Sequence, residues 1–374
     1  MNLNPESMTL RDKLHNLNFT VIGLVTLLSC IGFCVLYSAG GGSLSPWAQS
    51  QMVKFLIGFI CMIGLAVLDI RLLMKYAYGF YGVALILLIL VHVIGMVGMG
   101  AQRWIGIGWL RLQPSELMKI GLILTLACYY HRRSLEEIQH IRFVWLPLSL
   151  IFVPAILVLK QPDLGTTVLL VIIGTSLLFV AGVRLWYFIA AFGGVLISLP
   201  IAWGFLHTYQ KKRILTFLNP EQDPLGAGYH ILQSKIALGS GGILGKGFLK
   251  GTQSHLNFLP EKQTDFIFTM FCEEFGLVGA LVLVVLYGFL IFHCLLIALQ
   301  CRSAFTRLMS FGVAISLFIY VFINMAMVIG LVPVVGVPLP FISYGGTSLI
   351  TLLVGVGLLL NADLNKNLKM LRYH

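Results

Sequence analysis

The chain has 374 residues, of which 58% are hydrophobic and only 10% are charged, and its mean hydropathy is +0.94. Because soluble domains carry about 25% charged residues, this composition excludes a soluble protein and indicates an integral membrane protein. The net charge of +11 does not indicate nucleic acid as a partner, since much of it lies in short connections between apolar segments. The seven cysteines have the spacing of neither a zinc site nor a disulfide framework, and we interpret them as packing residues.

The apolar residues are grouped in segments that are long enough to cross about 30 Å of hydrocarbon as helices. The eighth segment is longer than one crossing requires, so its helix is tilted, extends beyond the bilayer or contains a break. The sequence therefore predicts one all-α polytopic membrane domain over residues 1–374, with about ten transmembrane helices. The segments are 18–38, 51–68, 76–97, 114–130, 143–159, 166–182, 186–206, 267–299, 308–330 and 343–361.

Lys and Arg residues are concentrated in the connections on one side of the predicted bundle. The short connections on the other side contain only Arg103, Arg111 and Lys160. By the positive-inside rule, the N-terminus (1–17) and the C-terminus (362–374) are cytoplasmic. The long polar loop 207–264, between helices 7 and 8, then faces the periplasm or cell exterior. The first apolar segment is long enough to span, so we expect a retained helix and no cleaved signal peptide.

A polar segment precedes the fourth apolar segment. Pro114 suits the first position of a helix, and Glu116 and Lys119 are three residues apart, on one helical face, where they can pair. Arg103 and Arg111 lie on the outer side and could bind phosphates through bidentate contacts. The neighbouring tryptophans are either part of such a site or simple interfacial anchors.

Two further segments carry polar groups on the outer side. In the turn after the fifth apolar segment, Lys160 and Asp163 could form a local ion pair. In the long loop, residues 229–238 have the spacing of a short amphipathic helix on the membrane surface. The Gly-rich stretch 239–251 follows with Lys246; its glycines would let backbone N–H groups approach an anion. Alternatively, this stretch is a flexible basic loop against lipid headgroups.

Carboxylates occur where the long loop enters the eighth helix. Asp265 either caps that helix or serves a functional site at the membrane boundary. Glu273 and Glu274 lie deeper in the apolar helix, where structural ion pairs are the favoured role. The segment 331–348 contains three prolines and then hydroxyl side chains such as Ser343. Irregular backbone near membrane depth lines a cavity or is buried in protein, unless this is an ordinary loop.

Acids, cations and a Gly-rich basic loop on one outer face would suit a pyrophosphate-linked lipid substrate. Sugar transfer from such a donor needs a base for the acceptor hydroxyl and positive charge for the departing pyrophosphate. It needs no general acid, because pyrophosphate leaves as an anion.

These residues resemble the SEDS family (shape, elongation, division and sporulation proteins), and within it the rod-shape branch. The resemblance covers the whole length and is carried by GAQRWIGIG, LQPSELMKI, QPDLGT, GSGGILGKGFLKGTQSHLNFLPEKQTDFIF and GLVPVVGVPLPFISYGGTS. It implies a peptidoglycan glycosyltransferase that polymerises lipid II during cell elongation, on the outer face of the cytoplasmic membrane, and releases undecaprenyl pyrophosphate.

The resemblance also implies roles for individual residues. Asp265 would be the essential base, and Arg103, Glu116 and Lys119 would line the central cavity, joined by Arg111. We include Lys246 and Ser343 among the expected residues that bind substrate or pyrophosphate.

The resemblance further implies a growing glycan strand as second substrate, a class B penicillin-binding protein and other elongation-complex proteins as partners, and a divalent cation such as Mg²⁺. No metal-ligand spacing in the sequence shows that cation. Two alternatives remain at this point. A lipid II flippase would also contain buried acids and broken helices, although it should place charges along a path through the bilayer. A scaffold that only recruits a transpeptidase would leave the charged cavity unexplained.

Overall fold

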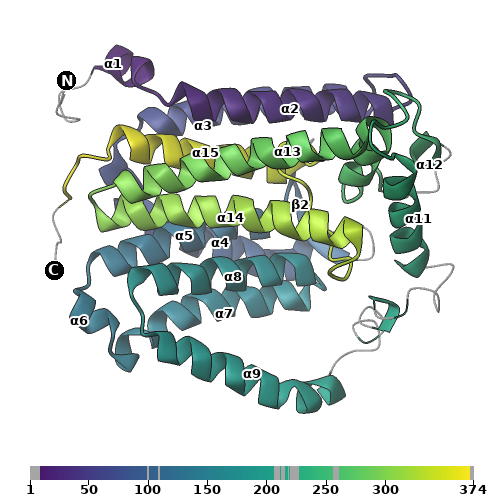
Figure 1. Ribbon diagram of the computed structural model, residues 1–374. Coiled ribbons are helices and arrows are strands. Elements are labelled where there is room, and N and C mark those ends of the chain that lie inside the picture. Colours follow the sequence, from purple (N-terminus) through teal and green to yellow (C-terminus); the bar gives the residue numbers. More distant parts are fainter. Residues whose placement is uncertain are drawn as a thin grey trace.

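The apolar segments fold into long helices that lie side by side (Figure 1). The computed structural model describes residues 9–98, 101–107, 110–205, 211, 215–217, 219, 227–255 and 261–370. Within these residues, eight helices are long and apolar enough to cross a membrane. They are α2 (Phe19–Ala39), α3 (Trp47–Val67), α4 (Ile70–Ile94), α7 (Trp145–Lys160), α8 (Leu164–Ala181), α13 (Ile267–Gln300), α14 (Ala304–Ile329) and α15 (Gly346–Leu364).

Two more helices coincide with the remaining predicted spans. The first, α5 (Pro114–His131), is less apolar because of its charged and aromatic residues, yet it is buried along almost its whole length by its neighbours. The second, α9 (Leu185–Phe205), has a shorter apolar part within the described residues. Each predicted span therefore has a helix, and the prediction of an all-α polytopic membrane protein is confirmed.

Helix ends follow local sequence signals. The side chains of Asn18 and Asp69 cap the first turns of α2 and α4 by accepting hydrogen bonds from backbone N–H groups. At the other ends, α8 and α14 stop at Gly182 (φ +103°) and Gly330 (φ +82°). These left-handed conformations favour glycine, which has no Cβ to clash.

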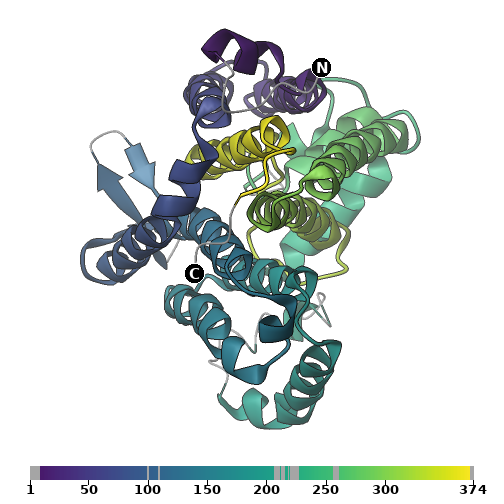
Figure 2. The same cartoon turned by 90° about the vertical axis from the view of Figure 1, so that its left-hand side faces the viewer.

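The centre of the bundle consists of α5, α14 and α15, most of whose residues are buried. On one side α15 packs against α3 at glycines: a Cβ on Gly58 would lie 2.5 Å from Leu353 Cδ1, and one on Gly357 would lie 2.7 Å from the carbonyl oxygen of Met62. Figure 2, viewed along the helices, shows α15 inside the bundle beside α3. Such close approach at small residues is typical of membrane helices.

A small antiparallel sheet connects α4 to α5. Its strands are β1 (Met96–Gly98), β2 (Ala101–Ile107) and β3 (Leu110–Leu112), in the order β1-β2-β3. The register pairs Met96 with Trp104 and Gly106 with Arg111. Strands project from the side of the bundle next to α4 (Figure 2). The sheet places Arg103, on β2, close to the end of the bundle where α5 begins.

Short helices cover both ends of the bundle. At one end are α1 (Leu10–His15), α6 (Leu135–Ile138) and the 3₁₀ helix η2 (Ile141–Phe143), with the end of α15. At the opposite end, α11 (Ala227–Ser240) and α12 (Thr252–His255) belong to the long loop (Figure 1). The predicted amphipathic helix is thus present as α11. Much of the loop 207–264, including 220–226 and 256–260, lies outside the described residues.

The helix α11 docks against the bundle through a buried serine. The Ser234 hydroxyl lies 2.8 Å from Thr269 Oγ1 and donates a hydrogen bond of 2.9 Å to the carbonyl oxygen of Val328. These bonds join the long loop to α13 and α14. One face of the helix, with Lys235 and Ile236, stays exposed.

The over-long helix α13 contains a break at Gly276, which has φ +65° and ψ −164°. The Gly-rich loop fills this break with backbone hydrogen bonds: the N–H of Leu277 donates to Gly242 (3.0 Å) and the N–H of Lys246 donates to Glu273 (3.0 Å). A Cβ on Gly245 would lie 2.1 Å from the carbonyl oxygen of Glu274. The over-long segment was predicted to be tilted, to extend beyond the bilayer or to contain a break, and the structure shows the break.

Candidate functional site

Asp265 lies in a tight turn at the end of the long loop, immediately before α13. The N-cap position of α13 is Phe266, and no side chain caps the helix. The Asp265 carboxylate accepts no hydrogen bond from any residue in the described part of the chain, and its side chain is only partly buried. The interpretation of Asp265 as a helix cap is therefore wrong, and its carboxylate can contact a substrate.

The backbone of this turn is held tightly although the carboxylate is not. The Ser343 hydroxyl donates a 2.7 Å hydrogen bond to the carbonyl oxygen of Thr264. The amide of Asn324, on α14, donates to the carbonyl oxygens of Asp265 (3.0 Å) and Val337 (2.7 Å). The turn and the Pro-rich segment are thus fixed to each other, so Asp265 has a defined position.

Three connecting segments meet around the Asp265 carboxylate. Gly336, at φ +73°, brings the Pro-rich segment so close that a Cβ there would lie 3.4 Å from Asp265 Oδ2. On the other side of that segment, a Cβ on Gly165 would lie 2.6 Å from the carbonyl oxygen of Val335. The predicted irregular segment therefore runs between Asp265 and the start of α8, and it forms one wall of the site.

Arg103 and Asp163 complete the surroundings. The Arg103 guanidinium donates to the carbonyl oxygens of Gln161 (3.2 Å) and Pro162, and its Nε lies 3.8 Å from Asp163 Oδ2. Asp163 also caps α8 by accepting a 3.1 Å hydrogen bond from the N–H of Thr166. Asp163 pairs with Arg103 and not with Lys160, so the predicted Lys160–Asp163 ion pair is not formed.

The electrostatics of the turn suit a proton acceptor. Burial, reinforced by the negative charges of Glu261 and Asp163, raises the pKa of Asp265 from 3.8 to about 6, and the positive charge of Arg103 opposes this shift. A carboxylate with that pKa is ionised at neutral pH but is a stronger base than an ordinary Asp. In the same turn, burial lowers the pKa of the Lys262 ammonium group.

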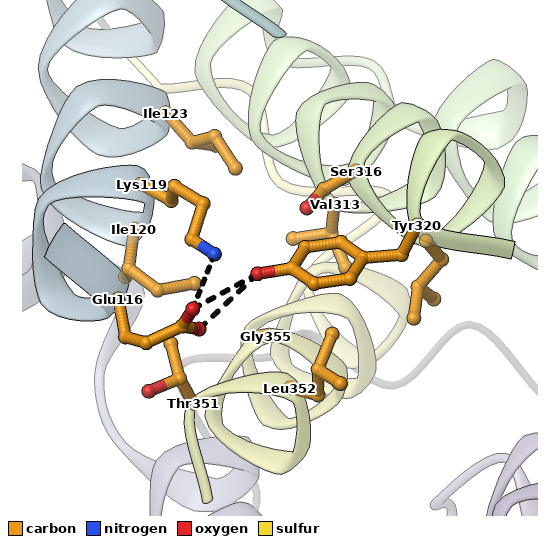
Figure 3. Close-up of a pocket in the computed structure, with 11 residues that line it drawn as sticks. Glu116, Lys119, Ile120, Ile123, Val313, Ser316, Tyr320, Thr351, Leu352 and Gly355 are labelled. Carbon is orange, nitrogen blue, oxygen red and sulfur yellow. Dashed lines mark hydrogen bonds and ion pairs between the residues drawn. The ribbon is translucent and has the colours of Figure 1, made fainter. Parts of the chain in front are cut away.

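A second polar cluster lies inside the bundle between α5, α14 and α15 (Figure 3). Lys119 Nζ donates a 2.7 Å hydrogen bond to Glu116 Oε1, as their spacing predicts, and both side chains are about 95% buried. The Tyr320 hydroxyl donates to both Glu116 oxygens, at 3.1 and 3.3 Å, and its ring centroid lies 4.4 Å from Lys119 Nζ. Figure 3 shows the three groups pointing toward one another across a small cavity that Ser316 and Thr351 also line.

Lys246 lies in neither cluster. Its ammonium group donates to Glu273 Oε1 at 2.8 Å, and the same oxygen accepts the backbone N–H groups of Thr252 (2.8 Å) and Gln253 (2.9 Å). Glu273 therefore ties the Gly-rich loop and α12 to α13, which agrees with the predicted structural role. Glu274 accepts a hydrogen bond from the Ser38 hydroxyl of α2.

The predicted site residues thus divide into three groups. Asp265, Arg103 and Ser343 lie at the end of the bundle that carries the long loop, Glu116 and Lys119 form a buried pair inside the bundle, and Lys246 belongs to the contacts that anchor the Gly-rich loop. The side chain of Arg111 lies outside the described residues.

Two residues that complete these clusters were not singled out from the sequence, namely Asn324 and Tyr320. Both are polar residues inside the apolar helix α14 and are buried. That position is the signal that could have found them, because polar side chains within a membrane helix are costly without a partner.

A divalent cation would have few protein ligands here. Among the described residues, no three His, Cys, Asp or Glu side chains are grouped closely enough to hold a metal ion. The negative charge of Asp163 is close enough to contribute to the raised pKa of Asp265. Such a pair would suit Mg²⁺ only together with oxygen atoms from a substrate, since Mg²⁺ often combines one or two carboxylates with phosphates.

Comparisons with known proteins identify the family. A family model described as cell cycle protein, of the FtsW, RodA and SpoVE type, matches residues 13–368. The chain belongs to the SEDS family. This SEDS protein is 42% identical to the peptidoglycan glycosyltransferase MrdB of Escherichia coli K12 over 98% of both chains.

Solved structures agree with this assignment. One, from a study of polymerisation and crosslinking by a peptidoglycan synthase complex, covers 94% of this chain and 99% of its own, with 32% identity and a TM-score of 0.83. Another is the rod shape determining protein RodA of Thermus thermophilus, with 29% identity over 94% of this chain and 98% of its own, and a TM-score of 0.71. The predicted family and enzyme class are confirmed.

Proposed function

We propose that this SEDS protein is a peptidoglycan glycosyltransferase that polymerises lipid II into glycan strands, with Asp265 as the catalytic base. The observation that carries the proposal is the Asp265 carboxylate itself. It caps no helix, its turn is fixed by Ser343 and Asn324, and burial raises its pKa to about 6 although the charge of Arg103 opposes that shift. The name of the relative from Escherichia coli supports the same reaction.

The proposed reaction needs one proton acceptor and positive charge. Asp265 removes the proton from a sugar hydroxyl of the acceptor, and the hydroxyl oxygen forms a bond to the anomeric carbon of the donor with inversion. The bond between that carbon and the pyrophosphate oxygen breaks, and its electron pair leaves with undecaprenyl pyrophosphate. Arg103, whose positive charge acts on the Asp265 carboxylate, would stabilise the leaving anion.

The other candidate residues have proposed roles that follow from their contacts. Glu116 and Lys119 bind substrate in the inner cavity, with Arg111 joining the cationic groups at the outer end. Ser343 acts by holding the turn of Asp265. Lys246 would have to leave Glu273 to contact a pyrophosphate.

The proposed setting is the cytoplasmic membrane, with both termini in the cytoplasm and the Asp265 site facing outward. In Figure 1, α1 and the end of α15 lie at the opposite end of the bundle from the long-loop helices, which supports this orientation. The proposed partners are lipid II, the growing glycan strand, a class B penicillin-binding protein and other elongation-complex proteins. The peptidoglycan synthase complex among the similar structures supports the penicillin-binding partner.

The test is a reconstitution with lipid II. Purified protein with its penicillin-binding partner should convert lipid II into glycan polymer and release undecaprenyl pyrophosphate. A parallel experiment in sealed vesicles follows the movement of lipid II from one leaflet to the other. Polymer formation supports the proposal, whereas lipid movement without any polymer would establish a flippase instead.

A further inference from the structure

The Pro-rich segment contains a tight turn with a strained backbone at residues 339–343, here called the strained turn. Phe341, in its middle, has φ +65°, and a bulky residue keeps that conformation only where its surroundings hold it. Two bonds close the turn locally: the Ser343 N–H donates to the carbonyl oxygen of Leu339 (3.0 Å), and the Leu339 N–H donates to the Ser343 hydroxyl oxygen (2.8 Å). Because Phe341 is buried, the groups that hold it belong to the neighbouring helices.

Two membrane helices hold the strained turn. On α13, the buried hydroxyl of Tyr287 donates a hydrogen bond to the carbonyl oxygen of Pro340, the residue before Phe341. On α2, Gly32 lies so close that a Cβ there would be 2.7 Å from Ile342 Cα and 2.8 Å from the carbonyl oxygen of Phe341. The two helices also pack against each other (Figure 1). A hydrogen bond before Phe341 and a backbone contact after it therefore restrain the strained residue.

The strained turn in turn holds the backbone next to Asp265. The Ser343 hydroxyl donates to the carbonyl oxygen of Thr264 at 2.7 Å, and the N–H of Tyr344 donates to that of Gln263 at 2.8 Å. These bonds reach the two residues that immediately precede Asp265. The position of its carboxylate therefore depends on the conformation of the strained turn.

The hydrogen bond of Tyr287 differs from those of other buried tyrosines in what it supports. The hydroxyl of Tyr81, on α4, also donates to a backbone carbonyl oxygen, that of Leu150 at 2.9 Å. Leu150 lies within α7, whose own hydrogen bonds fix its backbone. Pro340 lies in an irregular segment without such bonds, so its conformation depends on contacts such as that of Tyr287.

We propose that Tyr287 and Gly32 are positioning residues for glycosyl transfer, which hold the strained turn in the conformation that fixes Asp265. Neither residue is assigned a contact with substrate; both act through the backbone. Without the hydroxyl of Tyr287, Phe341 can leave the left-handed region, and Ser343 then moves away from the Asp265 turn. The inference rests on the proposed role of Asp265 as the base.

Two variants perturb the strained turn, and each has a matched control. Tyr287→Phe removes one hydroxyl and keeps the ring, and Tyr81→Phe removes a hydroxyl that has the same kind of acceptor. Gly32→Ala places a methyl group against the strained turn. Gly23→Ala adds the same group to the same helix at a position where a Cβ would meet no described atom within 4 Å.

Two measurements report on the Asp265 turn independently. The first is kcat and KM for lipid II polymerisation by the full chain with its penicillin-binding partner, and the second is amide hydrogen exchange of residues 261–266. Tyr287→Phe and Gly32→Ala should lower kcat by roughly 10- to 100-fold, because a displacement of about 1 Å can cost about 100-fold. KM should stay within about twofold, since no proposed substrate contact is removed. Exchange of residues 261–266 should become faster in both variants, whereas both controls should match the wild type.

Three results would overturn the inference. One is a wild-type kcat in Tyr287→Phe, and another is an equal loss of kcat in Tyr81→Phe, which would show that any buried tyrosine hydroxyl has this effect. The third is unchanged exchange of residues 261–266 in Tyr287→Phe. If the wild type forms no polymer, the proposed function fails, and the exchange measurement alone decides whether Tyr287 and Gly32 hold the Asp265 turn.

Discussion

Removing one member of the Glu116–Lys119 pair should destabilise the protein far more than removing both. The two side chains are only 5% and 3% exposed, so each depends on the other for compensation of its charge. Glu116→Gln leaves an ammonium ion buried without its counter-ion, and Lys119→Met leaves a buried carboxylate with only the Tyr320 hydroxyl. Breaking a buried pair from one side costs about 3–5 kcal/mol.

The double variant Glu116→Gln/Lys119→Met contains neither charge. Replacing a buried ion pair by uncharged groups is often neutral or stabilising. The free energy of unfolding of the double variant should therefore be no more than about 1 kcal/mol below that of the wild type, or should exceed it. The two single effects would then be strongly non-additive, by several kcal/mol in a double-mutant cycle. The neutral amide that replaces the Glu116 carboxylate has a carbonyl oxygen that can still accept the hydrogen bond of Tyr320.

The assay is unfolding in detergent micelles, followed by temperature or denaturant, for the four proteins of the cycle. A matched control is Lys366→Met, because Lys366 pairs with Asp363 at 2.9 Å and the same spacing, but its side chain is 39% exposed. Because the Lys366 ammonium group can be solvated, that pair should contribute less than about 1 kcal/mol. Single variants as mild as Lys366→Met, or additive single effects, would refute this reasoning.

Three further predictions concern other parts of the protein. Because the pKa of Asp265 in the folded protein is raised to about 6, ionisation of this carboxyl group lowers the stability of the folded wild type at pH values above 6. In thermal unfolding, Asp265→Asn should therefore be more stable than the wild type at pH 8, by up to roughly 3 kcal/mol. This advantage should disappear below about pH 4, where the carboxyl group is protonated in both the folded and the unfolded protein. Gly276→Ala should lower the free energy of unfolding by at least about 2 kcal/mol, because Gly276 has φ +65° and a Cβ would lie 2.3 Å from the Gly245 nitrogen. Gly288→Ala, in the same helix but with open space around the Cβ, should leave it unchanged in the same assay. Tyr320→Phe should cost about 1–3 kcal/mol, because it removes a buried hydrogen bond to a charged group; an unchanged melting temperature would contradict that role.

The sequence was sufficient for much of the fold. Apolar segments of membrane-spanning length predict where each long helix lies, because the hydrocarbon thickness fixes the length that a helix needs. The sequence also predicts the pairing of Glu116 and Lys119, since residues three positions apart lie on the same face of a helix. The excess length of the eighth segment pointed to irregularity, but only the structure places the break at Gly276 and shows the loop that fills it.

The rest of the site depends on contacts between distant segments, which local patterns do not specify. Asp163 could pair with Lys160 in its own turn, but it pairs with Arg103 from the small sheet. Lys246 has the charge expected of a phosphate ligand, yet the fold places it on Glu273, 27 residues later. In the sequence, Asp265 is placed where a helix-capping residue is expected. Only the structure shows that the N-cap is Phe266 and that Asp265 does not cap α13.

The rate of lipid II polymerisation by purified Asp265→Asn protein tests the central claim most directly. The matched control is Asp69→Asn, because Asp69 caps α4 at the opposite end of the bundle and Asn caps a helix equally well. Loss of a general base lowers rates by about 10²–10⁴-fold, so Asp265→Asn should make little or no glycan while Asp69→Asn matches the wild type. Folded Asp265→Asn protein that polymerises lipid II at a near wild-type rate would contradict the account.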